Sequence, residues 1–455
     1  MRNFPAAAVI LMASGLSLVA NAQVVKQGGE FQVNTFTSGH QENPKLATDA
    51  KGNFVVVWTR RNDGDVDSVA AQRFSSLGAN LGTEFVVNTY TTSSQSVPAV
   101  AVKPNGDFVV IWESHGQDGE LGGIFGQRFN SSGAQVGTEF QINTFTSSDQ
   151  ANPAIAIDPV GNFVVVWEGP SFPGDNDVIA GQRYDGTGAK VGTEFVVSSI
   201  DDNDKEKVAV AMDATGNFVV VWENHNFGNL EDVVAQRYDN TGAKVGTEFQ
   251  VNTFTSGAQE HAAIAMDSAG NFVVVWDSRG QHDGSREGIF GQRFNSSGAT
   301  VGTEFQANTY TTNEQEDPSV ALDTAGNFVV TWYSGACGSD GGGCHGTGQD
   351  GDLDGAFGQR FSSSGAPLGT EFQINTYTTG DQTGPKVVAQ PGGNFVVAWQ
   401  GGNDEDGDDD GIFAQRFGAF HNLAPTMSTA GLALAAAGLL VAGIVALTLR
   451  ARRGS

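Results

Sequence analysis

The sequence predicts an all-β fold, a seven-bladed β-propeller of four-stranded antiparallel blades. Three observations lead to this prediction: one unit recurs seven times, each unit contains four short β-type segments, and the two ends of the repeat region complement each other. Radial repetition of small sheets leaves only short open edges, and regular internal repetition is the sequence signature of such an architecture.

Three marks identify the repeat. Each copy has a tryptophan that ends a stretch similar to GNFVVVW, then a Gln-Arg pair, then a Glu-Phe pair. The spacing from the glutamate to the glutamine before the next strand is always 11 residues, from there to the tryptophan 17, and from the Gln-Arg pair to the next glutamate 12. All length variation therefore falls in the loop between the tryptophan and the Gln-Arg pair. The tryptophans are Trp58, Trp112, Trp167, Trp222, Trp276, Trp332 and Trp399.

Each copy is predicted to form four strands, as the third copy illustrates. Residues 154–157 alternate in character, and residues 158–162 contain the Asp, Gly and Asn of a tight turn. A β-branched run follows at residues 163–167. The third and fourth strands are expected at residues 179–184 and 194–197, separated by a second turn that contains glycine. No repeat segment has helical periodicity.

The two ends of the repeat region predict a closed ring. A lone fourth-strand sequence lies at residues 30–34, and the repeats stop after a third-strand sequence at residues 412–417. Pairing the two would complete the seventh blade, whereas an open solenoid would gain nothing from the mismatch. We therefore expect Glu30 to meet the Gln415-Arg416 segment in a cross-strand pair, as the other six glutamates meet their own Gln-Arg strands.

One face of the predicted propeller collects the variable loops and a ring of glutamines. Loops from the second to the third strand and from blade to blade emerge on the same side. Binding sites favour loops on a rigid scaffold, so this face is the expected binding face. The glutamine ring is expected to satisfy backbone groups near the channel, and the tryptophans to pack between blades. The ring is Gln41, Gln95, Gln150, Lys205, Gln259, Gln315 and Gln382.

The variable loops concentrate the negative charge, because they hold 25 of the 51 acidic residues and 4 of the 24 basic ones. In three copies, aspartates stand nine, seven and five residues before the glutamine of the Gln-Arg pair. Alternate carboxylates can converge on a hard cation, and a following glycine permits the sharp turn of a calcium loop. The alternative is an acidic loop that is simply solvated. The predicted calcium ligands are Asp63, Asp65, Asp67, Asp350, Asp352, Asp354, Asp406, Asp408 and Asp410.

The cysteines and the N-terminus indicate export. Residues 1–22 are predicted to be a signal peptide, because an apolar run over residues 6–20 precedes small residues suited to cleavage. Cys337 and Cys344, the only cysteines, lie in the long sixth loop and are expected to form a disulfide in an oxidising compartment. Zinc binding with His345 is the alternative.

The C-terminal residues are predicted to cross a membrane. Residues 430–449 form an apolar run with one polar side chain, and residues 450–455 contain three arginines, which indicates a transmembrane helix and a basic cytoplasmic tail. The linker at residues 421–429 contains Ala-Pro-Thr-Met-Ser. This order of a short proline motif, an apolar span and an arginine cluster resembles the PEP-CTERM and IPTL-CTERM sorting signals of Gram-negative secreted proteins. The resemblance implies a sorting peptidase as a partner.

Composition excludes two classes. A net charge of -27 argues against nucleic acid as a partner, because such proteins need basic surface to displace counterions. A hydrophobic content of 39% with 30 phenylalanines is too apolar for a disordered chain.

We expect residues 23–420 to be a binding or scaffold propeller with calcium-stabilised loops and a glycan or protein ligand on the loop face. It would act in adhesion or in the envelope of a Gram-negative bacterium, at the cell surface, in the outer membrane or outside the cell. No catalytic residue is predicted, because none of the seven histidines lies in a recognisable nucleophile context, so the chain is predicted not to be an enzyme. The alternatives are a passive envelope protein and a carboxylate-dependent polysaccharide lyase or glycosidase.

Overall fold

A computed structural model describes most of the repeat region. Both ends of the chain, with the predicted signal peptide and the apolar run at residues 430–449, lie outside the described residues, as do Cys337 and Cys344. The chain divides into two compact units, residues 1–419 and 420–455, and the first contains every described residue. Within the described part, no helix is long and apolar enough to span a membrane. The described residues are 24–61, 66–119, 121–170, 177–199, 204–226, 230–279, 287–335, 348–402, 405, 407 and 409–418.

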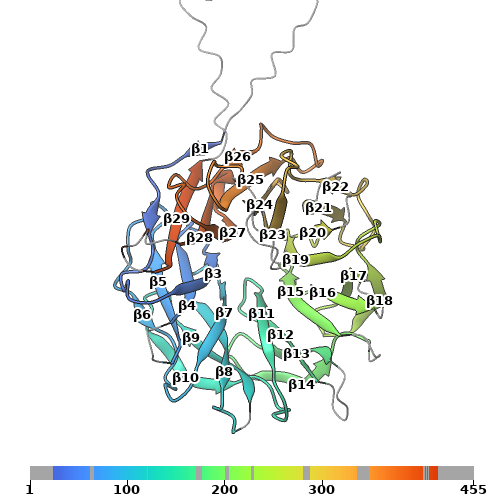
Figure 1. The fold of residues 1–455 in the computed structure, drawn as a ribbon. Helices are drawn as coiled ribbons and strands as arrows, with labels where there is room; N and C mark the ends of the chain where they lie inside the picture. The colour runs from blue at the N-terminus through green and yellow to red at the C-terminus, as the bar shows by residue number, and fades with distance from the viewer. Residues whose placement is uncertain are drawn as a thin grey trace, which may run out of the picture. The chain divides into compact units, whose positions relative to one another are not determined.

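Seven antiparallel sheets surround a central channel, which confirms the predicted seven-bladed propeller (Figure 1). In each sheet, strands that follow one another in the chain are neighbours. The first strand of each blade contacts the first strands of both adjacent blades, so these seven strands enclose the channel. Blades 1 to 4 consist of β3 (Gln41–Thr48), β4 (Phe54–Arg60), β5 (Ser68–Phe74) and β6 (Phe85–Val86); β7 (Gln95–Val102), β8 (Phe108–His115), β9 (Gly122–Phe129) and β10 (Gln135–Gln141); β11 (Ala151–Ile157), β12 (Phe163–Pro170), β13 (Asp177–Tyr184) and β14 (Lys190–Val196); and β15 (Lys205–Met212), β16 (Phe218–Asn226), β17 (Leu230–Tyr238) and β18 (Lys244–Gln250). Blades 5 to 7 consist of β19 (Gln259–Met266), β20 (Phe272–Arg279), β21 (Glu287–Phe294) and β22 (Phe305–Gln306); β23 (Glu314–Leu322), β24 (Phe328–Gly335), β25 (Gly355–Phe361) and β26 (Phe372–Gln373); and β27 (Gln382–Ala389), β28 (Phe395–Gly401) and β29 (Gly411–Gly418) with β2 (Phe31–Gln32) and β1 (Val25–Lys26).

The hydrophobic core lies between the blades. Trp58 of blade 1 shares a cluster with Val396 and Ala398 of blade 7, and the other clusters likewise join neighbouring blades. Each of the seven tryptophans is at most 1% exposed. Burial of valine and tryptophan between sheets supplies most of the stabilisation in such a stack. The prediction that the tryptophans pack between blades is confirmed.

The glutamine ring is structural, as predicted. Gln41 Oε1 accepts a hydrogen bond from Trp58 Nε1 at 3.0 Å, and Gln41 Nε2 donates to the Gly39 carbonyl at 3.1 Å. The same bond from tryptophan to glutamine forms in blades 2 and 5. These buried amides satisfy polar groups that would otherwise be left without partners at the loop end of the channel.

The first described residues close the ring. Strand β2 pairs with β29 through Phe31 and Ala414, and Val33 N donates to the Ile412 carbonyl at 2.7 Å. The predicted completion of the seventh blade is therefore confirmed. Strand β1, which the sequence did not predict, also pairs with β29. Closure removes the open edge that β29 would otherwise expose.

The expected cross-strand partner of Glu30 is wrong, although the strand pairing is right. The Glu30 carboxylate accepts hydrogen bonds from Thr376 N at 2.6 Å and Thr376 Oγ1 at 2.7 Å, on the preceding blade. Glu84 binds Thr35 in the same way, and Arg416 donates to the Ser76 carbonyl of the next blade at 3.2 Å. The repeated Glu and Arg residues thus fasten neighbouring blades to each other.

Every first strand carries a β-bulge two residues after the glutamine ring. The register with the second strand shifts there in each blade, and the residue at this place has a φ between 49° and 58°. Such bulges re-aim side chains, and left-handed φ is uncommon for residues other than glycine. We call these seven positions the bulge ring. It consists of Asn43, Val97, Asn152, Lys207, His261, Asp317 and Gly384.

In blades 1, 3 and 4, the residue after the tryptophan supports the bulge of the next blade. Thr59 Oγ1 accepts from Val97 N at 3.2 Å, and Glu168 Oε1 accepts from Lys207 N at 2.5 Å. Glu223 accepts from the backbone of His261 in the same manner. Each of these side chains accepts a hydrogen bond from a backbone amide that the bulge would otherwise leave unpaired. Glu168 and Glu223 therefore have a structural role.

Candidate functional site

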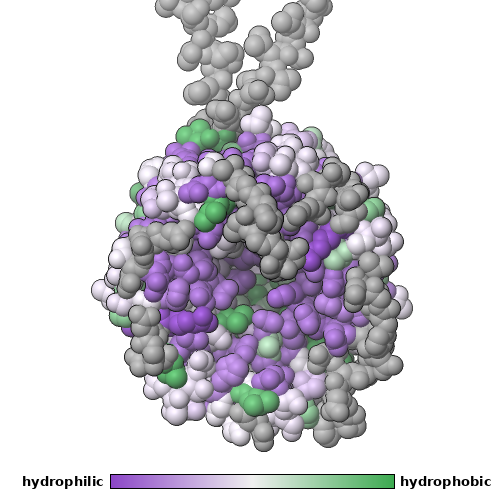
Figure 2. All heavy atoms as spheres, in the orientation of Figure 1, coloured by the Kyte–Doolittle hydropathy of each residue, from purple (hydrophilic) through white to green (hydrophobic). Residues whose placement is uncertain are grey.

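The central channel contains a cavity of about 610 Å³, lined by the first strands of all seven blades. Figure 2 shows this hollow, with mainly hydrophilic residues around it and a few hydrophobic ones within it. Cavities of this volume are typical of small-molecule sites. The channel is therefore the candidate functional site.

The charged and titratable lining residues lie on one part of the channel wall. The lining residues from β7 and β11 are uncharged, whereas the other five first strands each contribute an ionisable group. Tyr333 from β24 adds a phenol. The ionisable lining residues are Lys45, Lys207, His261, Glu316, Asp317, Tyr333 and Lys386.

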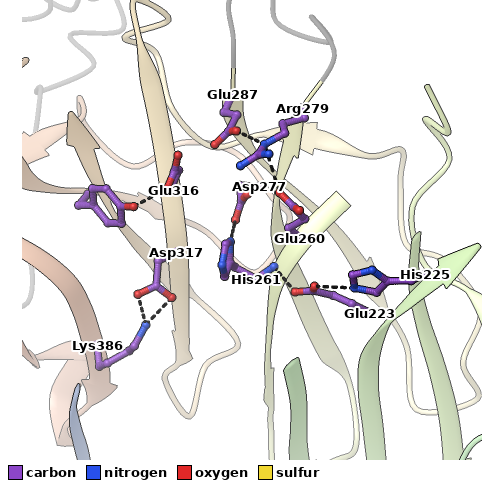
Figure 3. Close-up of polar contacts among 11 residues, drawn as sticks. Glu223, His225, Glu260, His261, Asp277, Arg279, Glu287, Glu316, Asp317 and Lys386 are labelled. Atoms are coloured by element: carbon purple, nitrogen blue, oxygen red, sulfur yellow. Dashed lines mark hydrogen bonds and ion pairs between the residues drawn. The ribbon is translucent and has the colours of Figure 1, made fainter. Parts of the chain in front are cut away.

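His261 and Asp277 form a buried pair in blade 5 (Figure 3). His261 Nδ1 lies 2.9 Å from Asp277 Oδ1, and the Asp277 side chain is fully buried. The Asp277 charge and this hydrogen bond raise the pKa of His261 to about 10, and burial raises the pKa of Asp277 to about 6. At neutral pH the pair therefore holds an imidazolium beside a carboxylate, and the imidazolium faces the channel.

Tyr333, Glu316, Glu287 and Arg279 form a second polar group beside this pair. The Tyr333 hydroxyl donates to Glu316 Oε2, and Arg279 Nε donates to Glu287 Oε1. Burial and the adjacent Glu316 carboxyl raise the pKa of Glu287 to about 9. Glu287 thus interacts both with the Arg279 cation and with the Glu316 carboxyl. Arg279 Nε also lies 3.3 Å from Glu260 Oε2.

Asp317 and the lysines form the third group. Lys386 Nζ lies 2.7 Å from Asp317 Oδ1 and 2.8 Å from Asp317 Oδ2. Although burial opposes ionisation, Lys386 and His261 lower the pKa of Asp317 to about 2. Burial and the neighbouring Lys386 and Lys207 lower the pKa of Lys45 to about 8. The Lys45 side chain is partly accessible to water in the channel.

The His261 pair makes stability depend on pH. Because the folded-state pKa of His261, about 10, lies above its ordinary value of 6.5, its contribution is fully present below pH 6.5 and is lost as pH rises through 10. We expect the free energy of unfolding to fall between pH 7 and 10 more steeply for the natural protein than for His261→Gln. Urea unfolding at several pH values measures both slopes. Equal slopes would contradict the proposed charge state.

The predicted calcium ligands are described only in part. Asp63, Asp65, Asp406 and Asp408 lie outside the described residues.

In the sixth copy, Asp350 and Asp352 bind different partners. Asp350 Oδ2 accepts from Asn375 Nδ2 at 3.2 Å, and Asp352 Oδ2 accepts from Gly380 N at 3.1 Å. Burial raises the pKa of Asp354 to about 7, with a further contribution from nearby carboxylates. In the first copy, Asp67 Oδ1 lies 3.4 Å from Arg61 Nε. Calcium binding by these loops stays a prediction.

Two other groups of potential metal ligands occur among the described residues. In each group the ligand atoms lie within 4.8 Å of one another. The first group includes Asp410, whose Oδ2 lies 3.0 Å from His40 Nδ1 and accepts from Gln400 Nε2 at 3.0 Å. The groups are His40, Glu42 and Asp410, and Glu260, His261 and Asp277.

His261, Tyr333 and the channel lysines were not predicted as site residues from the sequence. His261 shares no register with another histidine, but it does share the bulge position with one residue of every other blade. Counting residues from the glutamine ring, rather than comparing residue types, would have identified the position of His261 as one that every blade shares. Asp277 occupies the position after the tryptophan, which holds Glu in three other blades.

Comparisons with known proteins show the fold. No family model and no curated protein matches the chain. A protein of unknown function from Dyadobacter fermentans is 10% identical, with a TM-score of 0.50 over 87% of this chain and 99% of its own. An ulvan lyase, which is a polysaccharide lyase, is 9% identical, with a TM-score of 0.48 over 86% and 95%. An α-L-arabinanase from Penicillium chrysogenum is 9% identical, with a TM-score of 0.47 over 86% and 98%.

The prediction that the chain is not an enzyme is contradicted. Solved structures similar to it include a polysaccharide lyase and an arabinanase. The prediction looked for a histidine in a recognisable nucleophile context, and such a local motif does not detect groups that different blades contribute. The channel instead brings together groups from different blades, including His261 of blade 5 and Tyr333 of blade 6. The described part of this chain is a seven-bladed propeller whose channel wall holds proton donors and acceptors.

Proposed function

We propose that this chain is an enzyme that cleaves linkages of a polysaccharide inside the central channel. The observation that carries the proposal is the wall formed by blades 5 and 6, where His261, Tyr333 and Glu316 line one cavity. Acid–base sites typically hold titratable groups side by side in a cavity, where the surroundings shift the pKa values of these groups in opposite directions. Here a protonated imidazole lies near an ionised Asp317.

His261 is the proposed proton donor. Cleavage of a glycosidic bond needs a proton at the leaving oxygen, and a positioned imidazolium can supply it. Asp277 is a positioning residue, because its carboxylate accepts from Nδ1 and leaves Nε2 as the nitrogen available to a ligand. A fully buried carboxylate behind a histidine fixes both the ring orientation and the tautomer.

Tyr333 supplies a second proton-transfer group. Its hydroxyl is held by Glu316, so its orientation is set by a residue that is itself 1% exposed. The Glu287 and Glu316 carboxyls do not resemble a glycosidase pair, because they interact directly with each other. A glycosidase needs its two carboxyls about 5 to 10 Å apart, with the sugar between them. This favours cleavage in which Tyr333 or a lysine, rather than a carboxylate pair, moves the second proton.

Three expectations from the sequence that the structure does not test are also part of this proposal. We propose that residues 1–22 direct export, that residues 430–449 and the sorting motif place the protein at the surface, and that the acidic loops bind calcium. Adhesion through the loop face is not needed for the channel to act. A polysaccharide outside the cell is a substrate that an exported enzyme can reach.

The purified protein tests the proposal directly. It is incubated with a panel of neutral and acidic polysaccharides, and the release of new reducing ends is measured over time. We expect cleavage of at least one member. Binding of a polysaccharide without release of reducing ends would reject the enzymatic proposal and favour a binding propeller. Absorbance from an unsaturated product separates elimination from hydrolysis.

A further inference from the structure

Three lysines line the channel of a strongly acidic protein. The chain has nine lysines in all and a net charge of -27, yet Lys45, Lys207 and Lys386 all face the same cavity. A random distribution over the surface would not collect them there. Their common location needs an explanation beyond solubility.

The repeat does not require lysine at these places. Lys45 and Lys386 stand at the second residue after the bulge ring, on the neighbouring strands β3 and β27. The other five blades carry small residues at this register. These are Ala99, Ala154, Ala209, Ala263 and Ser319. The fold therefore accepts a small side chain at this register, and the two lysines serve something other than blade packing.

The lysines are poorly compensated within the channel. Asp317 binds Lys386 and also attracts Lys45, but among the described residues neither Lys45 nor Lys207 has an ion pair within 4 Å. Burial and the neighbouring cations lower the pKa of Lys45, which shows the cost of gathering these charges. Like charges in a partly dry cavity repel strongly, and a bound anion relieves that repulsion.

We infer that Lys45, Lys207 and Lys386 bind an anionic substituent of the sugar, namely the carboxylate of a uronate residue. This inference rests on the proposed function, because it names the substrate class of the same channel. A carboxylate matches the spare positive charge, and the neutral wall of β7 and β11 leaves room for the sugar rings. A sulfate ester presents the same chemistry and is distinguished below.

A bound uronate makes elimination the natural reaction. The Lys207 and Lys386 cations beside the carboxylate acidify the proton on the adjacent carbon, and Lys45 accepts that proton in the fraction of molecules in which its amine is uncharged. The electrons of the broken C–H bond form a carbon–carbon double bond, and the bond from the next carbon to the linkage oxygen breaks. The oxygen takes a proton from His261. No water, oxidant or reductant enters this step.

Binding is tested without relying on activity. D-glucuronate, glucose 6-sulfate and D-glucose are titrated into the purified protein by calorimetry at low and high salt. We expect glucuronate to bind, glucose not to bind measurably, and salt to weaken the binding. Lys45→Ala and Lys386→Ala copy the residue of other blades, so both should fold. Each should weaken glucuronate binding about tenfold or more, because a charged hydrogen bond is lost. Lys51→Ala, an exposed turn residue, is the matched control.

The outcomes separate this inference from the proposed function. Preferential binding of the sulfate would support the anion cluster and assign it to sulfated sugars. Equal binding of glucose and glucuronate, or unchanged affinity in both channel variants, would overturn the inference. Cleavage of a neutral polysaccharide with no anion binding would leave the enzyme proposal standing alone. Lysine-dependent glucuronate binding without any cleavage would leave only the inference.

Discussion

Removal of residues 24–34 should cost on the order of 5 kcal/mol of folding free energy, because it deletes several buried and charged contacts together. These residues supply β1, β2, the Glu30 contact to Thr376 and the buried Val33. Blade 7 would keep three strands and expose the edge of β29. We therefore expect a large fall in the calorimetric melting temperature and association that depends on protein concentration.

A shorter deletion provides the control. Removal of residues 24–27 takes away β1 but leaves β2 and the Glu30 contact in place. We expect a clearly smaller loss of stability from it. If both deletions melt at the temperature of the intact protein, ring closure by the N-terminal strand contributes nothing to stability. Sedimentation at several protein concentrations would show whether the open edge recruits a second molecule.

Replacement of His261 by glutamine should lower kcat by about 10² to 10⁴, the usual contribution of a positioned acid or base. Glutamine keeps the size and polarity of the side chain but cannot donate a proton as an acid. Asp277→Asn should lower kcat as well and shift the pH profile, because the raised pKa of His261 depends on that carboxylate. Initial rates on the cleaved polysaccharide measure both variants.

His115→Gln is the matched control for His261. His115 also lies near a carboxylate, with its Nε2 2.9 Å from Glu113 Oε1, but it does not line the cavity. Its replacement should leave kcat unchanged. A His261→Gln protein with natural activity and an unchanged melting temperature would remove His261 from the reaction. A rise in KM with an unchanged kcat would point instead to a role in ligand binding.

The fold could be predicted because the repeat marks are rigid in spacing and its ends complement each other. Residues 30–34 and residues 412–417 each lacked a partner strand. A closed ring, in which the two segments pair with each other, supplies that partner to both. The partner of Glu30 could not be predicted, because spacing along the chain relates residues within a blade. Thr376 belongs to the preceding blade, and only the radial packing brings it near.

The site was less predictable for a related reason. The acidic loops drew attention because their residues are close in sequence. His261, Glu316 and Lys386 come from three blades and are brought together by the ring. The bulge that turns His261 toward the channel depends on a left-handed φ. The local sequence does not predict this conformation, because the seven copies carry six different residue types at that position.

The variety of residues in the bulge ring has a practical consequence. Asparagine, valine, lysine, histidine, aspartate and glycine all occupy the same backbone conformation there. Backbone geometry at these positions is thus decoupled from the choice of side chain. Randomised libraries confined to this circle of seven positions could redirect ligand preference while sparing the packed interior.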